Sequence, residues 1–367
     1  MIVPLVDLIA DSNEILQDIE KSVLKVIRSG KYILSEEVNL FEKELAQWNN
    51  TKYCIGVSSG TDALLLALLA LDIKEGDEVI TTPFTFIATV EAILVTGAKP
   101  AFVDINSTDL NINPDLIKEK ITEKTKAIIP VHLYGCPCDM TSILSIAREY
   151  NLYIIEDLAQ AIGAEWCDKK VGNFGDINCV SFFPAKNLGC MGDAGAMFTA
   201  NENYQKKLVA LRQHGSLKKY YHQYLGVNAR IDEIQAAILR VKLKKIDEWN
   251  NKRKEIAKIY RENLKGLPLK FQEPDDKAKC VYNQFTIIVE KRDKLMEYLN
   301  KNNIATAIHY PIPLHLQPVL NDLGYKIGDL AVSEELANRV LSLPIYPAME
   351  PDRIEYVCDS IIKFFRS

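Results

Sequence analysis

The first 245 residues alternate short apolar runs with longer stretches of helical periodicity. We predict strands at Tyr53–Val57, Glu78–Thr82, Pro100–Val103, Ala127–Pro130, Tyr153–Ile155 and Cys179–Phe183, separated by helices that include Thr61–Leu71, Ala88–Thr96 and Met140–Tyr150. Short apolar strands separated by helices are typical of an α/β fold with a parallel or mostly parallel sheet covered on both faces. In such a sheet, ligands are expected outside the carboxyl ends of the strands.

The last third of the chain follows a different pattern. Residues 233–263 predict one long amphipathic helix, with Ile234, Ala237, Ile238, Val241, Leu243 and Ile246 on its apolar side. A strand at Gln284–Val289, a helix at Asp293–Asn302 and two final helices follow. We therefore predict a large domain at residues 1–245 and a smaller C-terminal α/β domain at residues 246–367, and the chain length also favours two domains.

Composition and charge narrow the class of protein. Hydrophobic residues make up 48% and charged residues 25% of the chain, as in ordinary globular proteins. The net charge of −5 is too acidic for a general nucleic-acid binder. The N-terminal stretch lacks the basic region of a signal peptide, and the longest apolar stretch, Ala63 to Leu71, is about half of what a membrane span needs. We expect a soluble, cytoplasmic protein with no membrane or nucleic-acid partner.

The cysteines and histidines do not predict a metal site. Cys136 and Cys138 form the one close pair among eight cysteines, and no HExxH pattern occurs among the five histidines. A chain of this length with eight scattered cysteines is also not a disulfide scaffold. We expect the cysteines to be buried as small apolar side chains and predict no bound metal.

Three polar stretches fall where predicted strands end. In VSSGTDAL, the residues Ser59, Gly60 and Thr61 lead directly into a helix, whose positive end and free N–H groups suit a phosphate. In LYIIEDLAQ, four apolar residues lead into Glu156 and Asp157, and in SFFPAKNLG, Lys186 follows Ser181 by five positions. The alternatives are a simple helix cap for the serine and the aspartate, and a solvent-exposed position for the lysine.

Together these stretches place a phosphate-binding turn, a carboxylate and an amine on one rim of the sheet. That combination matches pyridoxal phosphate, which needs an amine for its Schiff base and an acid to keep its pyridine nitrogen protonated. The protonated ring withdraws electrons, and the released lysine moves the proton. We therefore predict Lys186 and Asp157 as catalytic residues and pyridoxal 5'-phosphate as the cofactor.

The chain resembles, from end to end, the DegT/DnrJ/StrS family of sugar aminotransferases. The matching stretches are GKYILSEEVNLFEKELA, SSGTDAL, TPFTFIAT, IPVHLYG, IEDLAQAIGA, SFFPAKNLG, GDAGA, GVNARIDEIQAAIL and AIHYPIPLHLQP. The resemblance implies the aspartate-aminotransferase-like fold (fold type I of the pyridoxal phosphate enzymes), with a large and a small domain.

The resemblance also implies residue roles. Lys186 would form the internal aldimine, Asp157 would pair with the ring nitrogen, Phe86 would stack on the ring, and Gln160 would lie near the ring hydroxyl. Ser59, Gly60, Thr61 and Ser181 would hold the phosphate, which Asn228 of the neighbouring subunit would also reach, so a homodimer is expected. Dehydratases that resemble this family carry histidine in place of the Schiff-base lysine, so Lys186 favours transamination, with L-glutamate as the donor.

The stretches GVNARID, SFFPAKNLGCMGD and AIHYPIPL resemble the aminotransferase that acts on UDP-2-acetamido-3-keto-glucuronate. HLQPVLNDLGYKIGDL is equally similar to enzymes that act on dTDP-3-keto-6-deoxyhexoses, but those often place histidine where this chain has Ile162. We therefore favour a UDP-2-acetamido-3-keto hexose or hexuronate, used for surface polysaccharide or lipopolysaccharide precursors. A dTDP-3-keto-6-deoxyhexose or a 4-keto sugar is the alternative.

The candidate substrate-binding residues are Arg230, His309, Tyr310 and His315. His309 and Tyr310 lie in a loop flanked by prolines, where polar residues are often functional, although a surface turn is the alternative. Arg230 could hold a carboxylate of the sugar or of glutamate, whereas a structural ion pair with Asp232 or Glu233 is the alternative.

Two hypotheses from other classes compete with the aminotransferase. A nicotinamide-dependent sugar dehydrogenase is disfavoured because no GxGxxG follows the first strand. A non-catalytic regulator that binds a sugar nucleotide would keep the fold but would not need the complete set of lysine, aspartate, glutamine and serine.

Overall fold

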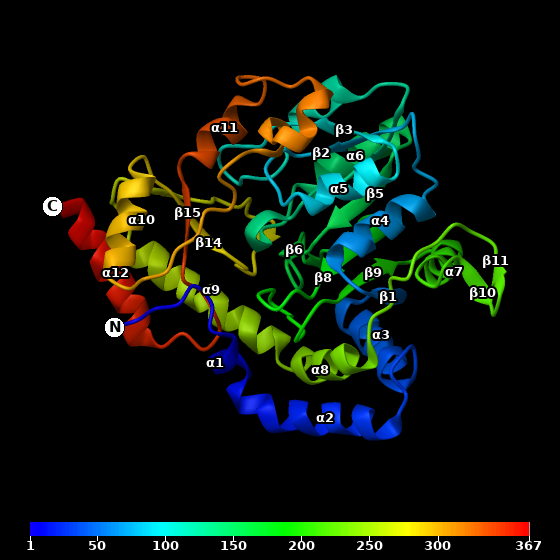
Figure 1. Cartoon of the computed structure of the whole chain (residues 1–367). Helices are drawn as coiled ribbons and strands as arrows, with labels where there is room; N and C mark the ends of the chain where they lie inside the picture. The colour runs from blue at the N-terminus through cyan, green and yellow to red at the C-terminus, as the bar shows by residue number, and fades with distance from the viewer. Residues whose placement is uncertain (367) are drawn as a thin grey trace.

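A computed structural model describes residues 1–366 and contains a central seven-stranded sheet (Figure 1). Its strand order is β1 (Tyr53–Val57), β9 (Gly195–Thr199), β8 (Ile177–Ser181), β5 (Tyr153–Asp157), β4 (Thr125–Ile128), β2 (Glu78–Thr81) and β3 (Lys99–Phe102). β9 is antiparallel to both of its neighbours, and every other pair is parallel. The predicted mostly parallel sheet and α/β class are confirmed.

Helices cover both faces of this sheet. The first face packs against α4 (Gly60–Ala70), α5 (Ala88–Val95) and α7 (Glu202–Leu211), and the second against α3 (Glu36–Asn49), α6 (Met140–Tyr150) and α8 (Glu233–Leu243). The short α1 (Leu8–Ser12) precedes α2 (Leu16–Ser29), which packs on α8. Leucine and alanine dominate α4, and six of its eleven residues are buried, all of them leucine or alanine.

Side-chain alternation along β5 and β8 decides which residues share a face. Ile155 and Cys179 pack with α4 and α5, whereas Ile154 and Val180 pack on the opposite face. Because successive side chains of a strand point to opposite faces, Asp157 points to the same face as Ile155, and Glu156 points to the same face as Ile154. The two neighbouring carboxylates are therefore directed to opposite sides of one strand.

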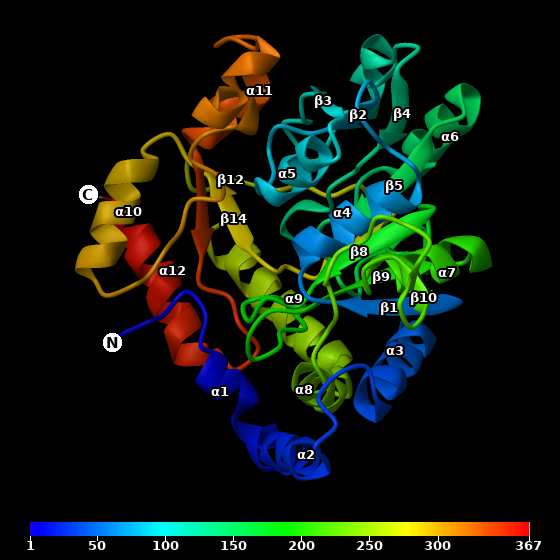
Figure 2. The same cartoon turned by 45° about the vertical axis from the view of Figure 1, so that its right-hand side comes forward.

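The C-terminal part has its own core. A three-stranded sheet orders β12 (Lys270–Phe271), β14 (Phe285–Ile288) and β15 (Val340–Leu343), and it packs against α9 (Ile246–Asn263), α10 (Arg292–Lys301) and α12 (Pro351–Arg366). Val3 from the N-terminus is buried in this core and pairs with Ile304. Figure 2 shows α9 running from α8 to this region. The division of the chain into domains at residue 245 stays a prediction.

Smaller elements complete the chain. α11 (Ala331–Ala337) precedes β15; β10 (Ser216–Lys218) and β11 (Tyr221–His222) form an outlying hairpin; and β13 (Ala278–Lys279) pairs with β6 (Glu165–Trp166), which also pairs with β7 (Lys169–Lys170). Within residues 1–366, no helix is both long and apolar enough to cross a membrane.

The prediction of one helix over residues 233–263 is wrong. The segment forms two helices, α8 and α9, that are separated at Lys244 and Lys245. The break lets each half bury a different face: Leu239 and Leu243 pack under the central sheet, whereas Ile256 and Tyr260 pack in the C-terminal core. A periodic pattern of hydrophobic residues does not distinguish one long helix from two that join at a bend.

Candidate active site

A cavity of about 470 Å³ opens at the carboxyl ends of β1, β5 and β8. It is lined by all but three of the residues predicted for the site, namely Ser59, Gly60, Thr61, Phe86, Asp157, Gln160, Ser181, Lys186, His309 and Tyr310. The cavity therefore lies where a ligand site was expected, outside the carboxyl ends of the parallel strands.

Lys186 lies in the turn that follows β8, where its backbone N–H donates to the carbonyl of Phe183 at 2.8 Å. Burial disfavours the charged ammonium and lowers the pKa of Lys186 to about 8, although the carboxylate of Asp157 partly opposes this shift. A lysine with this pKa supplies much more neutral amine near neutral pH than a solvent-exposed lysine does, and the neutral amine is the nucleophile.

Asp157 ends β5 and is 5% exposed. Its carboxylate accepts hydrogen bonds from Thr89 Oγ1 at 2.9 Å and from the backbone N–H of Ala159 at 3.1 Å. Desolvation dominates these bonds and raises the pKa of Asp157, while Lys186 and His132 oppose the rise. A carboxylate that accepts only two hydrogen bonds and has a raised pKa would be stabilised in its ionised form by a cationic partner.

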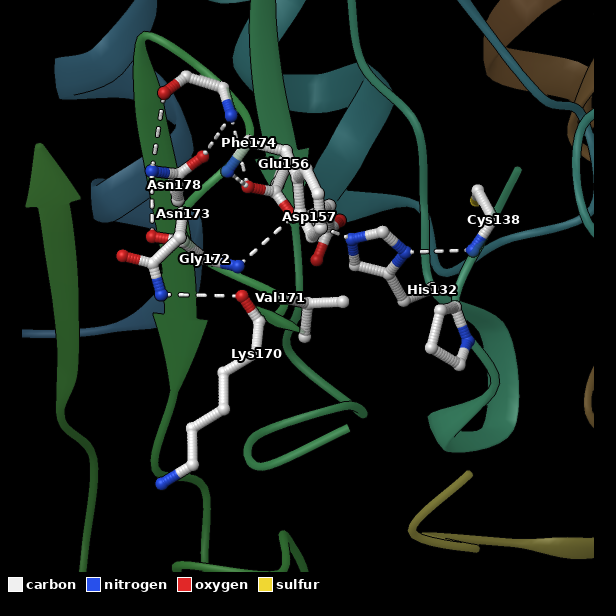
Figure 3. A network of polar contacts seen from close by, with 12 residues as sticks. His132, Cys138, Glu156, Asp157, Lys170, Val171, Gly172, Asn173, Phe174 and Asn178 are labelled. Carbon is white, nitrogen blue, oxygen red and sulfur yellow. Dashed lines mark hydrogen bonds and ion pairs between the residues drawn. The ribbon is translucent and has the colours of Figure 1, made fainter. Parts of the chain in front are cut away.

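Glu156, the preceding residue, belongs to a separate network on the other face of β5 (Figure 3). Its carboxylate accepts from the backbone N–H groups of Gly172, Phe174 and Gly175 at 2.9, 2.7 and 3.0 Å. The ring Nε2 of His132 lies 3.0 Å from its Oε2. These bonds outweigh complete burial and lower the pKa of Glu156, so this residue has a structural role.

The turn between β1 and α4 provides the predicted phosphate cradle. Ser59 caps α4 by accepting from the backbone N–H of Asp62 at 3.0 Å. Gly60 lies so close to the end of β8 that an added Cβ would be 2.7 Å from Ser181 Cβ. Because Gly60 has no side chain, Ser181 can approach the N-terminus of α4, and hydroxyl and N–H groups converge as phosphate binding requires.

One wall of the cavity consists of Gln160, Phe86 and Tyr310. Gln160 Oε1 accepts from the backbone N–H of Tyr134 at 2.6 Å, and its Nε2 donates to the hydroxyl of Tyr310 at 3.1 Å. The ring centroids of Phe86 and Tyr310 lie 6.2 Å apart. Phe86 is 56% exposed, so its ring is available to stack on a planar ligand.

These features fit pyridoxal phosphate. The cradle suits its phosphate, Asp157 suits a protonated ring nitrogen, and Lys186 suits its aldehyde. The site roles of the individual residues stay predictions, but the structure brings the necessary groups into one cavity.

Three predicted site residues lie outside the cavity lining. Asn228 is exposed and pairs through its backbone with Gln213. Arg230 forms no ion pair with Asp232 or Glu233 within the described chain, and its buried Nε has no hydrogen-bond partner. His315 is buried and contacts Glu334 Oε1 at 2.9 Å through Nε2.

Sequence reasoning missed two residues of this region. Thr89 bonds the Asp157 carboxylate from α5, and Tyr134 holds the side chain of Gln160. A threonine among the apolar residues of the predicted helix was the available signal for Thr89, because a buried hydroxyl needs a partner. The sequence offers no comparable signal for Tyr134.

Comparison with known proteins places the chain in a family. Residues 13–362 match the DegT/DnrJ/EryC1/StrS aminotransferase family. A pleiotropic regulatory protein from Geobacillus stearothermophilus is 44% identical, over 100% of this chain and 99% of the relative. An Acidithiobacillus ferrooxidans protein named UDP-N-acetyl-3-dehydro-alpha-D-glucosamine 3-aminotransferase is 43% identical, over 98% and 97%. An Aneurinibacillus thermoaerophilus dTDP-3-amino-3,6-dideoxy-alpha-D-galactopyranose transaminase is 42% identical, over 99% of each chain.

Solved structures agree with the fold. The crystal structure of DesV from S. venezuelae has a TM-score of 0.98 and 39% identity, covering 100% of this chain and 99% of that one. NtdA from Bacillus subtilis, with its bound cofactor PMP, has a TM-score of 0.93 and 35% identity, covering 100% and 86%. The predicted fold, transaminase class and pyridoxal phosphate cofactor are confirmed, and this chain belongs to the DegT/DnrJ/EryC1/StrS aminotransferase family.

Proposed function

We propose that this enzyme transfers an amino group from L-glutamate to a nucleotide-linked 3-keto sugar. A UDP-2-acetamido-3-keto hexose or hexuronate is the favoured substrate, as a precursor of a surface polysaccharide. The observation that carries the proposal is the convergence of Lys186, Asp157 and the cradle at Gly60 on one cavity. The names of the UDP-linked and dTDP-linked relatives support amination at position 3, and a dTDP-linked sugar is the alternative.

When bound, pyridoxal phosphate supplies an electron sink for the carbon that loses its proton. Asp157 keeps a negative charge beside the ring nitrogen and so favours the protonated ring. Lys186 would hold the cofactor through its amine and would carry the proton that is moved, for which a pKa of about 8 is well matched. Phe86 would stack on the ring, Gln160 would lie near the ring hydroxyl, and the cradle would hold the phosphate.

We infer that the working enzyme is a homodimer. Phe183, which lines the cavity, and Met191, two residues before the cavity-lining Asp193, are 53% and 45% exposed, and large apolar side chains that are exposed together often belong to an interface. A second copy of the chain would cover them and would bring Asn228 to the cradle of its neighbour, which explains why Asn228 lies outside its own cavity.

A panel of substrates tests the proposed reaction. Purified enzyme is incubated with L-glutamate and UDP-linked or dTDP-linked 3-keto and 4-keto sugars, and amination is scored by mass. We expect amination of the UDP-linked 3-keto sugars. Reaction of 4-keto sugars alone would contradict the regiochemistry, and reaction of no sugar would favour a regulator. Lys186→Ala is expected to lose both amination and the visible absorbance of covalently bound cofactor.

Hybrid dimers test the shared site. A dimer of one Lys186→Ala subunit and one Asn228→Ala subunit contains one intact site only if Asn228 serves its neighbour. We expect such purified hybrids to have about half of the wild-type activity per dimer, by counting intact sites. If Asn228 acts within its own subunit, the hybrid will be no more active than the Asn228→Ala homodimer.

A further inference from the structure

Lys186 lies in a tight turn whose two ends approach each other closely. The backbone N–H of Lys186 donates to the carbonyl of Phe183 at 2.8 Å. Gly189 lies so near Pro184 that an added Cβ would be 2.2 Å from the Pro184 carbonyl oxygen. Because the turn is this compact, the contacts that hold its backbone also determine where the lysine side chain begins.

Asn283, which precedes β14, holds this turn on both sides of the lysine. Its Nδ2 donates to the carbonyl of Ala185 at 3.2 Å and to Oδ1 of Asn187 at 2.9 Å. Ala185 and Asn187 are the two neighbours of Lys186 in the chain. Asn283 also lines the cavity, together with Lys186. A single amide group, 98 residues from Ala185 in sequence, therefore contacts both neighbours of the amine-bearing residue.

Asn187 and Asn250 extend this contact to α9. Nδ2 of Asn187 donates to Oδ1 of Asn250 at 2.7 Å and to the carbonyl of Val281 at 3.0 Å. Nδ2 of Asn250 donates to the carbonyl of Ile162 at 3.1 Å. Asn187 and Asn250 are 4% exposed and Asn283 is 5% exposed, so water does not compete for these bonds. We call the three residues the asparagine network.

Backbone carbonyls fix the orientation of every amide in the asparagine network. A carbonyl oxygen only accepts hydrogen bonds, so the atom that contacts Ala185, Val281 or Ile162 must be an amide nitrogen. The other atom of the Asn187 and Asn250 amides is then an oxygen, and each of these oxygens accepts from the neighbouring amide. Rotating any one amide by half a turn would place its oxygen against a carbonyl oxygen. The network therefore has one arrangement that satisfies its hydrogen bonds.

The backbone that carries Asn283 is itself anchored. The N–H of Val281 donates to the carbonyl of Gly135 at 2.9 Å. Nη1 of Arg253, which is 3% exposed, donates to the carbonyl of Asn283 at 3.4 Å. A side chain with a fixed backbone and a fixed amide orientation can hold a second segment in place, as the support of a reactive group requires.

We propose that Asn283 is a positioning residue for Lys186, which it holds so that the amine meets the aldehyde of a cofactor whose phosphate lies in the cradle. In that step the neutral amine adds to the aldehyde carbon, a C=N bond forms and one water molecule leaves. Holding the amine in place favours this attachment over free encounter. The inference rests on the role of Lys186 in the proposed function and deepens it.

Two forms of the cofactor separate positioning of the lysine from general stability. Pyridoxal phosphate carries the aldehyde, whereas pyridoxamine phosphate lacks it and binds only through contacts to its ring and phosphate. We define the aldehyde preference as the dissociation constant of pyridoxamine phosphate divided by that of pyridoxal phosphate. Calorimetric titration of the cofactor-free, full-length protein measures both constants. We expect a clear preference in wild type and none in Lys186→Ala.

Variants of the asparagine network test the positioning role. We expect Asn283→Ala to lower the aldehyde preference by about tenfold, as when a buried hydrogen bond is lost. Its affinity for pyridoxamine phosphate should stay within about twofold of wild type. Asn187→Ala leaves Asn283 its bond to Ala185 and should lower the preference by about threefold. An unchanged preference in both variants, or equal weakening of both cofactors, would overturn the proposal.

Asn178→Ala is the matched control. It removes a buried asparagine that donates to the carbonyls of Gly172 and Phe198 in the Glu156 network (Figure 3). We expect a lower melting temperature with an unchanged aldehyde preference, and a loss of preference as large as that of Asn283→Ala would contradict a specific role of Asn283.

Two further outcomes are distinguishable. If Asn283→Ala does not fold, the preference of Asn187→Ala decides the proposal. A wild-type protein without any aldehyde preference contradicts the role of Lys186 in the proposed function. A preference that Lys186→Ala abolishes but Asn283→Ala retains contradicts the positioning role alone.

Discussion

Glu156 and Asp157 are adjacent on β5 and both are almost completely buried, but they differ in their hydrogen-bond partners and in the direction of their pKa shifts. Glu156 accepts three backbone N–H groups and faces His132, and its pKa is lowered. Asp157 accepts one hydroxyl and one backbone N–H, and its pKa is raised. Since both are desolvated, the number and kind of donors decide the sign of the shift.

This difference shows how a buried acid can be assigned to structure or to function. A fully bonded carboxylate such as Glu156 ties loops to a strand and has no capacity for a ligand. Asp157 has unused capacity, and it faces a cavity that also contains Lys186. A cation that enters the cavity, such as a protonated pyridine nitrogen, would give the Asp157 carboxylate the additional charged hydrogen-bond donor that Glu156 finds in its own network.

The largest effect on activity is expected from neutralising Asp157. Asp157→Asn keeps the shape of the side chain but removes the charge that favours a protonated ring. We expect kcat to fall by about 10³-fold, as when one preorganised charged or polar group of an active site is lost. Steady-state kinetics with L-glutamate and the keto sugar measure this. A variant within tenfold of wild type would show that Asp157 does not tune the cofactor.

Neutralising Glu156 should instead destabilise the protein. Glu156→Gln places an amide NH₂ among three backbone donors and weakens the contact with His132. We expect the free energy of unfolding to fall by about 3 kcal/mol, typical of a disrupted buried charged network. Denaturant unfolding measures it. Activity of the remaining folded enzyme should stay within about tenfold, and a selective loss of activity at full stability would contradict the structural assignment.

Two glycine-to-alanine substitutions compare the phosphate cradle of the cavity with the loop that binds Glu156, and each adds only a methyl group. Gly60→Ala would place a Cβ 2.7 Å from Ser181 Cβ in the cradle, and Gly175→Ala would place one 2.6 Å from Asn178 Oδ1 beside Glu156. We expect Gly60→Ala to weaken cofactor affinity by about tenfold, near 1.4 kcal/mol of displaced phosphate contacts. Gly175→Ala should lower the melting temperature without changing that affinity. Cofactor titration by absorbance and thermal unfolding distinguish them, and exchanged effects would contradict the assignment.

The strands predicted from the sequence are enough to predict at which edge of the sheet the cavity lies. Apolar strands that end in Ser59, Asp157 and Ser181 place these residues at one sheet edge by topology alone, and the structure gathers them around one cavity. Strand alternation also separates Glu156 from Asp157. These inferences need only the period of the strand and the direction of the sheet.

Other features depend on contacts that no local pattern encodes. The bend between α8 and α9 follows from packing against two different cores. β9 was not predicted, because a short apolar strand such as Gly195–Thr199 resembles a buried turn until its two neighbours are known. His315 resembles a site residue in sequence, but it is buried against Glu334, a partner 19 residues away.

The smallest expected effect is a difference in how the two carboxylates respond to pH in the cofactor-free protein. The folded-state pKa of Asp157 is raised, so its ionisation costs stability once the pH exceeds that pKa. Asp157→Asn should therefore be slightly more stable than wild type at neutral pH, and the difference should vanish below the ordinary aspartate pKa of about 4. Glu156 has a lowered pKa and stabilises above its unfolded value, so the deficit of Glu156→Gln should shrink as the pH falls through the lowered pKa. Urea unfolding from pH 3 to 8 measures both differences, and two curves of the same sign would contradict the opposite pKa shifts that separate these neighbours.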